Sequence, residues 1–200
     1  MNGETKQGDN MAARKTSTRK SSHSAARSRA AARIAHTSST QRHVVKTREG
    51  RTKTEGAIRG GRGKYQFNLS KVKDVPAGTG YSTSHGGVVE GERMLVGYIH
   101  KERGTGSRMH THKNEQFNLV VRGTLVGSVN GKKIFAPAGT LIYIPANAPH
   151  TLVAHPRDKD VIFIAIKDLS QGIIGKAVDG KMTGPLYQKG FAPKGAARGS

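Results

Sequence analysis

The sequence predicts an all-β domain, a small barrel or sandwich, that follows a basic N-terminal arm. Short apolar or alternating runs recur from residue 65 onward, and Gly or Pro separates several of them. Asn130-Gly131 stands between two of these runs, and this pair supplies the two positive-φ residues of a type I′ hairpin turn. Residues 1–64 contain no Phe, Tyr or Trp, so every aromatic side chain lies at residue 65 or beyond.

Composition divides the chain into three segments. Residues 1–64 carry 16 Lys and Arg residues against four acidic ones, a net charge of +12 out of +21 for the whole chain. A segment this basic and rich in Ser, Ala and Arg cannot bury enough apolar surface to offset its ordering entropy, so we expect it to be disordered. Residues 65–178 form the predicted β domain, and the Gly, Pro and Lys-rich residues 179–200 are expected to drape over its surface.

The basic arm has three interpretations. It is a solvated extension without function, or a misassigned start, since Met11 can also initiate the chain. Alternatively, it binds nucleic acid non-specifically through phosphates, in which case the affinity falls steeply with salt. As a third alternative, residues 11–48 form an organelle transit peptide, because they are rich in Arg and Ser and poor in acids.

No membrane segment is expected, because no run approaches the roughly 18 apolar residues of a span. The N-terminus also lacks the apolar core of a secretory signal. We therefore expect a cytoplasmic protein, with organelle targeting as the alternative. The chain has no cysteine, so any bound metal must use nitrogen and oxygen ligands.

The expected strands follow one another at short and regular intervals, as in a sandwich or small barrel. In chain order they are Tyr65–Leu69, Arg93–Ile99, Gln116–Val121, Thr124–Val129, Lys133–Phe135, Thr140–Ile144, Thr151–Val153 and Val161–Ile166. No long helix is expected, and Asp168–Lys176 is the best candidate for a short one.

Three side chains with metal-binding capacity share one face of an extended segment. His110, His112 and Gln116 have the same parity, and strand side chains alternate with period two. His150 follows a Pro-rich turn near another apolar stretch. Three imidazole nitrogens and one amide oxygen predict an open site for a divalent first-row metal.

The strand that begins at Gln116 has two possible registers. In one, Gln116 and Asn118 face the interior, and Asn118 can orient Gln116. In the other, these polar residues face water, and Phe117 and Leu119 enter the core. The second register is favoured for the strand alone, because an unpaired inward polar group costs roughly 1–3 kcal/mol. The nearby histidines favour the first.

Two glycine-bounded motifs give the chain a resemblance to the cupins between Tyr65 and Asp168. The first, G-x5-H-x-H-x(3,4)-E-x6-G, falls on Gly104, His110, His112, Gln116 and Gly123. The second, G-x5-P-x-G-x2-H-x3-N, falls on Gly139, Pro145, Asn147 and His150. The resemblance implies an RmlC-like double-stranded β-helix, or jelly-roll barrel, with a metal among inward-facing ligands. It also implies homodimerisation.

The chain departs from the cupin pattern at three positions. Gln116 replaces the glutamate, Asn147 the second glycine and Ala154 the final asparagine. Asn tolerates left-handed turn conformations, so the change at Asn147 is mild. Gln116 is preferred as the ligand over the adjacent Glu115, whose side chain should point to the opposite face. A neutral amide leaves the net charge of a divalent site at +2, which strengthens the metal as a Lewis acid.

These residues predict a metal-dependent enzyme that acts on a small oxygenated substrate, such as a keto acid or sugar derivative. The metal is Mn, Fe, Ni or Zn. The alternatives are an Fe(II)-dependent dioxygenase with the same ligands, and a non-catalytic small-ligand-binding cupin with a polyanion-binding arm. Arg108, Tyr143 and His100 are the candidate catalytic residues, although a packing or rim role is favoured for each of them.

Overall fold

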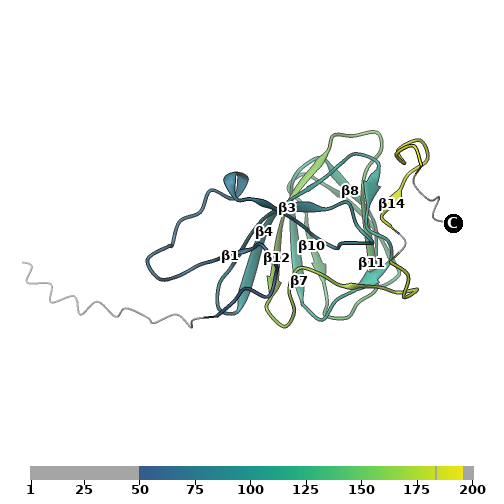
Figure 1. Cartoon of the computed structure of the whole chain (residues 1–200). Helices are drawn as coiled ribbons and strands as arrows, with labels where there is room; N and C mark the ends of the chain where they lie inside the picture. The colour runs from purple at the N-terminus through teal and green to yellow at the C-terminus, as the bar shows by residue number, and fades with distance from the viewer. Residues whose placement is uncertain (1–49, 183, 196–200) are drawn as a thin grey trace, which may run out of the picture. The chain divides into compact units, whose positions relative to one another are not determined.

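Two seven-stranded sheets form the described part of the chain, residues 50–182 and 184–195 of a computed structural model (Figure 1). The predictions of disorder, nucleic-acid binding and organelle targeting fall mainly on residues 1–49, which lie outside the described residues. Within the described part, no helix is long and apolar enough to cross a membrane. One short 3-10 turn, η1 (Leu69–Lys71), follows the first strand and precedes all the others.

The first sheet has the order β1-β3-β4-β12-β7-β10, and β2 pairs with β3 beside this path. Its strands are β1 (Ile58–Arg59), β2 (Asp74–Pro76), β3 (His85–Glu90), β4 (Met94–Lys101), β7 (Gln116–Arg122), β10 (Leu141–Ile144) and β12 (Val161–Asp168). All of its pairings are antiparallel except β1 with β3. Antiparallel pairing lets one face of the sheet lie on the core and the other face water.

The second sheet has the order β13-β6-β11-β5-β14, with β8 paired to β11 and β9 to β8. Its strands are β5 (Thr105–Gly106), β6 (His110–Thr111), β8 (Thr124–Val129), β9 (Lys132–Pro137), β11 (His150–Ala154), β13 (Lys176–Ala177) and β14 (Leu186–Tyr187). The first four strands belong to the first sheet, and after β4 the chain passes back and forth between the two sheets.

Alternating side chains from both sheets meet in one core. On β12 the inward row begins with Val161, Phe163 and Ala165, while Leu125 and Leu152 enter from β8 and β11. All five side chains are buried. This period-two pattern is the signal that predicted the strands from the sequence.

Seven of the eight predicted strands are confirmed by β4 and β7–β12. Tyr65–Leu69 was expected as a strand but is irregular and runs into η1, and Asp168–Lys176 contains no helix. The sequence also gave no sign of β3, because Gly86 and Gly87 interrupt its apolar pattern. These glycines allow close approach of the neighbouring backbone: a Cβ at Gly86 would lie 2.0 Å from the Tyr98 carbonyl oxygen.

The hairpin predicted at Asn130-Gly131 is confirmed. Both residues have positive φ, 48° and 79°, and they join β8 to β9 where Val129 pairs with Lys132.

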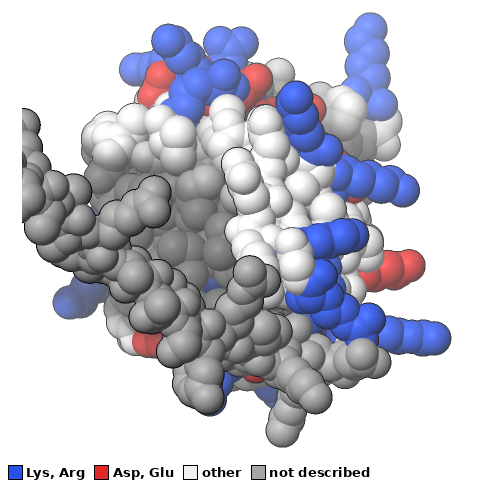
Figure 2. Space-filling view, turned by 90° about the vertical axis from the view of Figure 1, so that its left-hand side faces the viewer, with Lys and Arg blue, Asp and Glu red and all other residues white. Residues whose placement is uncertain are grey.

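Figure 2, viewed from the left-hand side of Figure 1, shows Lys and Arg side chains along the top and right-hand edges of the surface, with a few acidic ones among them.

The packed fold includes residues that precede position 65. Glu90 is fully buried at the end of β3, and its two carboxylate oxygens accept hydrogen bonds from the backbone N–H groups of Lys53 and Thr54, both at 2.7 Å. Thr54 is itself buried, and β1 pairs with β3. Polar anchoring explains why this segment, which lacks aromatic side chains, still joins the barrel.

Replacing Glu90 by Ala should therefore destabilise the barrel by about 3 kcal/mol, because two N–H groups lose a charged acceptor inside the protein. The measurement is the free energy of unfolding in urea. Glu102→Ala, at an exposed carboxylate, is the matched control and should stay within about 0.5 kcal/mol of the parent. Equal stabilities of the two variants would contradict the anchoring role of Glu90.

Candidate metal centre

Three buried histidines converge where the second sheet meets the loop after β6. His110 on β6 lies directly opposite His150 on β11 in the antiparallel register, and His112 follows two residues after His110. One ligand atom from each of the three imidazoles lies within 4.8 Å of the others. The structure thus brings together the three histidines that the sequence selected.

Backbone carbonyls set the tautomer of all three rings. Nδ1 of His110 lies 2.8 Å from the Arg108 carbonyl oxygen, and the Nδ1 atoms of His112 and His150 each lie 2.9 Å from such an oxygen, on Asn114 and Ala148. A carbonyl oxygen only accepts, so each Nδ1 must carry the proton. Each neutral ring therefore presents the bare lone pair of Nε2, which is the form that binds a metal.

The surroundings keep these rings neutral. Burial, followed by the charge of His150, lowers the pKa of His110 to about 2. Burial and the charge of Lys167 lower the pKa of His112 to about 3, and burial lowers that of His150 to about 4. At neutral pH the centre therefore contains three neutral rings, each with an unprotonated Nε2.

Gln116 faces the interior together with Asn118, at 6% and 1% exposure, whereas Leu119 is 39% exposed. The inward polar register is confirmed, and the opposite register is wrong. The Gln116 amide donates to Asn118 Oδ1 at 2.5 Å, which leaves its Oε1 free to act as an acceptor or a ligand. Asn118 thus orients Gln116. Glu115 points away, and its carboxylate accepts a hydrogen bond from Tyr143 at 2.8 Å.

A turn built on two prolines delivers His150. Ala148 N–H donates to the Pro145 carbonyl at 3.1 Å, and Asn147 has a φ of 62°, which Asn tolerates at little cost. The Asn147 N–H also donates to the His112 carbonyl at 2.8 Å. This bond ties the turn before His150 to the segment that carries His112.

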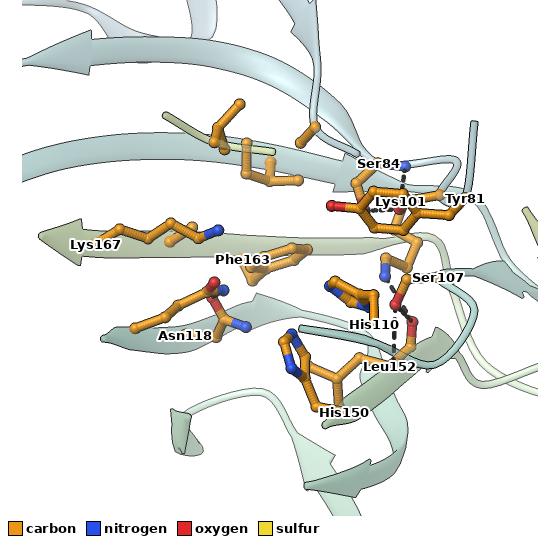
Figure 3. Close-up of a pocket in the computed structure, with 16 residues that line it drawn as sticks. Tyr81, Ser84, Lys101, Ser107, His110, Asn118, His150, Leu152, Phe163 and Lys167 are labelled. Atoms are coloured by element: carbon orange, nitrogen blue, oxygen red, sulfur yellow. Dashed lines mark hydrogen bonds between the residues drawn. The ribbon is translucent and has the colours of Figure 1, made fainter. Parts of the chain in front are cut away.

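A small cavity of about 50 Å³, open to solvent, adjoins the histidines. Figure 3 shows Lys167, Phe163 and Asn118 from the first sheet facing the same space as His110 and His150 from the second. The lining residues are Ala77, Tyr81, Ser82, Ser84, Ile99, Lys101, Ser107, His110, Gln116, Asn118, His150, Leu152, Phe163, Ala165, Lys167 and Ile173. No acidic residue is among these described residues.

Two lysines occupy buried positions in this lining. Lys101 and Lys167 are only 3% and 4% exposed, and burial lowers the pKa of each to about 7. The Lys101 ammonium donates to the Leu152 carbonyl at 2.6 Å and lies 5.9 Å from the centre of the Phe163 ring. Neither lysine was predicted from the sequence as a site residue.

A signal for the lysines is present in the strand patterns. Lys101 continues the inward row of Leu95 and Ile99 on β4, and Lys167 continues that of Phe163 and Ala165 on β12. A Lys with the parity of buried apolar residues is unusual, because Lys is almost never fully buried unless it is paired.

The three candidate catalytic residues lie outside the cavity lining. Arg108 pairs with Asp179 at 3.0 Å, and the ring of His100 stacks on His85 with centroids 5.7 Å apart. Tyr143 is half-exposed on the outer face of β10. The surroundings of all three residues fit the alternative role, that of a rim or packing residue.

Residues 97–167 match the sequence model of a family described as "Cupin domain". An RmlC-like cupin from Shewanella frigidimarina is 20% identical over 52% of this chain and 88% of its own, with a TM-score of 0.43. The polyketide cyclase RemF from Streptomyces resistomycificus is 17% identical over 54% and 80%, with a TM-score of 0.47. KdgF from Halomonas sp. is 23% identical over 38% and 69%, with a TM-score of 0.35. No curated protein sequence matches the chain.

The matched part of the barrel, residues 97–167, is a cupin domain. Three glycines of its two motifs, Gly104, Gly123 and Gly139, all have positive φ, which glycine adopts readily. The jelly-roll arrangement of two sheets agrees with the resemblance found in the sequence.

The donor set of this cupin fits a divalent metal ion. Among the described residues, Nε2 of His112 is a buried acceptor without a hydrogen-bond partner, which is costly unless something else satisfies it. The three Nε2 lone pairs and the Gln116 Oε1 are the groups that can hold the ion. Nitrogen and oxygen ligands of this kind suit Mn, Fe, Ni or Zn.

The stability of the metal-free cupin should fall as the pH drops from 7 to 5. In the unfolded chain these histidines take up protons near pH 6.5, whereas in the folded protein they do so only at lower pH. Their contribution is therefore present above pH 6.5, and each of the three loses up to about 1.4 kcal/mol per pH unit below it. Urea unfolding with a chelator present measures this slope. It should be shallower in His150→Asn, and a flat profile in the parent would contradict the assignment.

Proposed function

We propose that this cupin is a metal-dependent enzyme that acts on a small oxygenated substrate, such as a keto acid or sugar derivative, by Lewis-acid activation. The observation that supports the proposal is the hydrogen bond from each histidine Nδ1 to a backbone carbonyl, because it directs three Nε2 lone pairs toward one point. Preorganised neutral ligands beside a cavity are what a catalytic metal site with an open position needs.

His110, His112, His150 and Gln116 are the proposed ligands. None of the four is anionic, so the site keeps the full +2 charge of a divalent ion. A bound ion of this charge polarises a carbonyl and stabilises an enolate or alkoxide. Low anionic character also disfavours the trivalent state, which favours non-redox chemistry over reaction with oxygen.

The remaining cavity residues shape the environment of the substrate. Phe163 and Ile99 supply apolar walls that reduce water access and strengthen electrostatic interactions. Burial raises the pKa of Tyr81 to about 12, so its hydroxyl keeps its proton at neutral pH and can donate to a substrate oxygen. The Tyr81 ring packs against His110 with centroids 4.6 Å apart.

Homodimerisation stays a prediction. It is supported by apolar side chains that remain exposed on the outer face of the β7–β10 pair, where β10 is the last strand of the sheet order. Leu119, Val121, Leu141 and Tyr143 are between 39% and 56% exposed.

Gln116→Ala should weaken metal binding by about 10- to 100-fold, because one oxygen ligand is lost from the site. Glu115→Ala is the matched control and should retain the parental metal content, since its carboxylate lies on the other face and contacts Tyr143. Elemental analysis of the purified variants, followed by metal titration, measures both effects. Loss of metal in Glu115→Ala with retention in Gln116→Ala would overturn the ligand assignment.

Turnover of small keto acids and sugar derivatives by protein loaded with Mn, Fe, Ni or Zn tests the activity itself. Lewis-acid chemistry is expected to proceed without oxygen and with the redox-inactive Zn. Oxygen uptake that depends on Fe(II) and the substrate would instead indicate a dioxygenase. Stoichiometric ligand binding without turnover would indicate a non-catalytic cupin.

A further inference from the structure

Two buried lysine side chains line the cavity, and no acidic side chain of the described residues lines it with them. Among the described residues, neither Lys101 nor Lys167 forms a salt bridge, and no carboxylate lines the space that they face. The acidic residue whose charge acts on Lys167 is Asp168, the next residue along the chain. The Asp168 carboxylate instead accepts backbone hydrogen bonds from Glu115 and Ser170.

Contacts within the protein stabilise the buried side chain of Lys101, but none of the described contacts does so for Lys167. The Lys101 ammonium has the Leu152 carbonyl as an acceptor and the Phe163 ring nearby, so it is partly stabilised in the folded chain. Lys167 has no hydrogen-bond acceptor among the described contacts, although 96% of it is withdrawn from solvent. An isolated buried ammonium is expensive, and such groups are normally paired.

Lys167 lies beside the candidate metal centre. It is the direct cross-strand partner of Gln116, the proposed oxygen ligand, and both side chains are buried on the inner face of the first sheet. Its charge also acts on His112 and His150. A small molecule that occupies the cavity can therefore reach Lys167 and the point of histidine convergence at the same time (Figure 3).

We infer that the cavity binds a small carboxylate, with Lys167 pairing with the carboxylate group and Lys101 adding a second positive charge behind it. A carbonyl or hydroxyl oxygen next to that carboxylate would face the histidines, and this part of the inference rests on the proposed function. A carboxylate carries one negative charge, which one ammonium can balance, whereas phosphate sites often rely on a nest of successive backbone N–H groups. The substrate class thus narrows from oxygenated molecules in general to 2-oxo or 2-hydroxy acids.

The test compares pyruvate with its neutral amide, pyruvamide, by calorimetry. Each probe is titrated into metal-free protein and into protein loaded with Mn²⁺. Wild-type protein should bind pyruvate at least tenfold more tightly than pyruvamide in both forms. Lys167→Met keeps the length and apolar stem of the side chain but removes its charge, and it should reduce pyruvate affinity by about 10- to 100-fold while pyruvamide affinity stays unchanged.

Lys133→Met, at an exposed lysine on β9, is the matched control and should bind pyruvate as the wild type does. Lys101→Met should produce a smaller loss than Lys167→Met. Equal binding of acid and amide by the wild type, or unchanged pyruvate affinity in Lys167→Met, would overturn the inference. Circular dichroism and metal content, measured on each variant, show that any loss of binding occurs in folded protein.

The two proposals fail in different ways in this experiment. Protein that prefers pyruvate but holds no metal would retain the carboxylate subsite and contradict the proposed metal-dependent function. Protein that holds a metal and binds the acid and the amide equally would retain the metal centre and contradict the subsite.

Discussion

The antiparallel pairing of β6 with β11 is the constraint on which the site depends. It sets His110 directly opposite His150, although the two residues lie 40 positions apart in the sequence. Strand side chains alternate with period two, so a slip of one residue would turn one of these rings away from the other. The bond from the Asn147 N–H to the His112 carbonyl fixes the third ring to the same frame. The metal centre is thus a consequence of sheet register and of one turn.

The two sheets contribute different chemistry to the cavity. Two of the imidazoles come from strands of the second sheet, whereas the amide of Gln116 and the ammonium of Lys167 come from strands of the first. Neutral nitrogen ligands and cationic groups therefore face each other across a space bordered by apolar side chains. Buried polar groups lower the stability of a core unless each has a hydrogen-bond or charge partner. Proteins tolerate such destabilising groups mainly at functional sites.

Much of the fold and most of the candidate ligand set could be predicted from the sequence. Gly123 and Asn130-Gly131 mark turns through their backbone conformation alone, and the spacing of His110 and His112 encodes a shared face. β3 could not be found, because Gly86 and Gly87, where the neighbouring backbone packs closely, leave only Val88 and Val89 as an apolar signal. The residues around Thr54 were also missed, since the carboxylate of Glu90 anchors them through bonds distant in sequence. Lys167 was not predicted as a site residue, because lysine is normally exposed and only its position in the inward row of β12 indicates burial.

The positive cavity also governs how quickly a metal ion can enter it. A divalent cation that approaches through a space containing two ammonium groups is repelled, whereas an acid-lined entrance would concentrate it. Entry of the ion is therefore slower than through an acid-lined mouth. At a given affinity, slower capture also means slower release, because the ratio of the two rates sets the affinity.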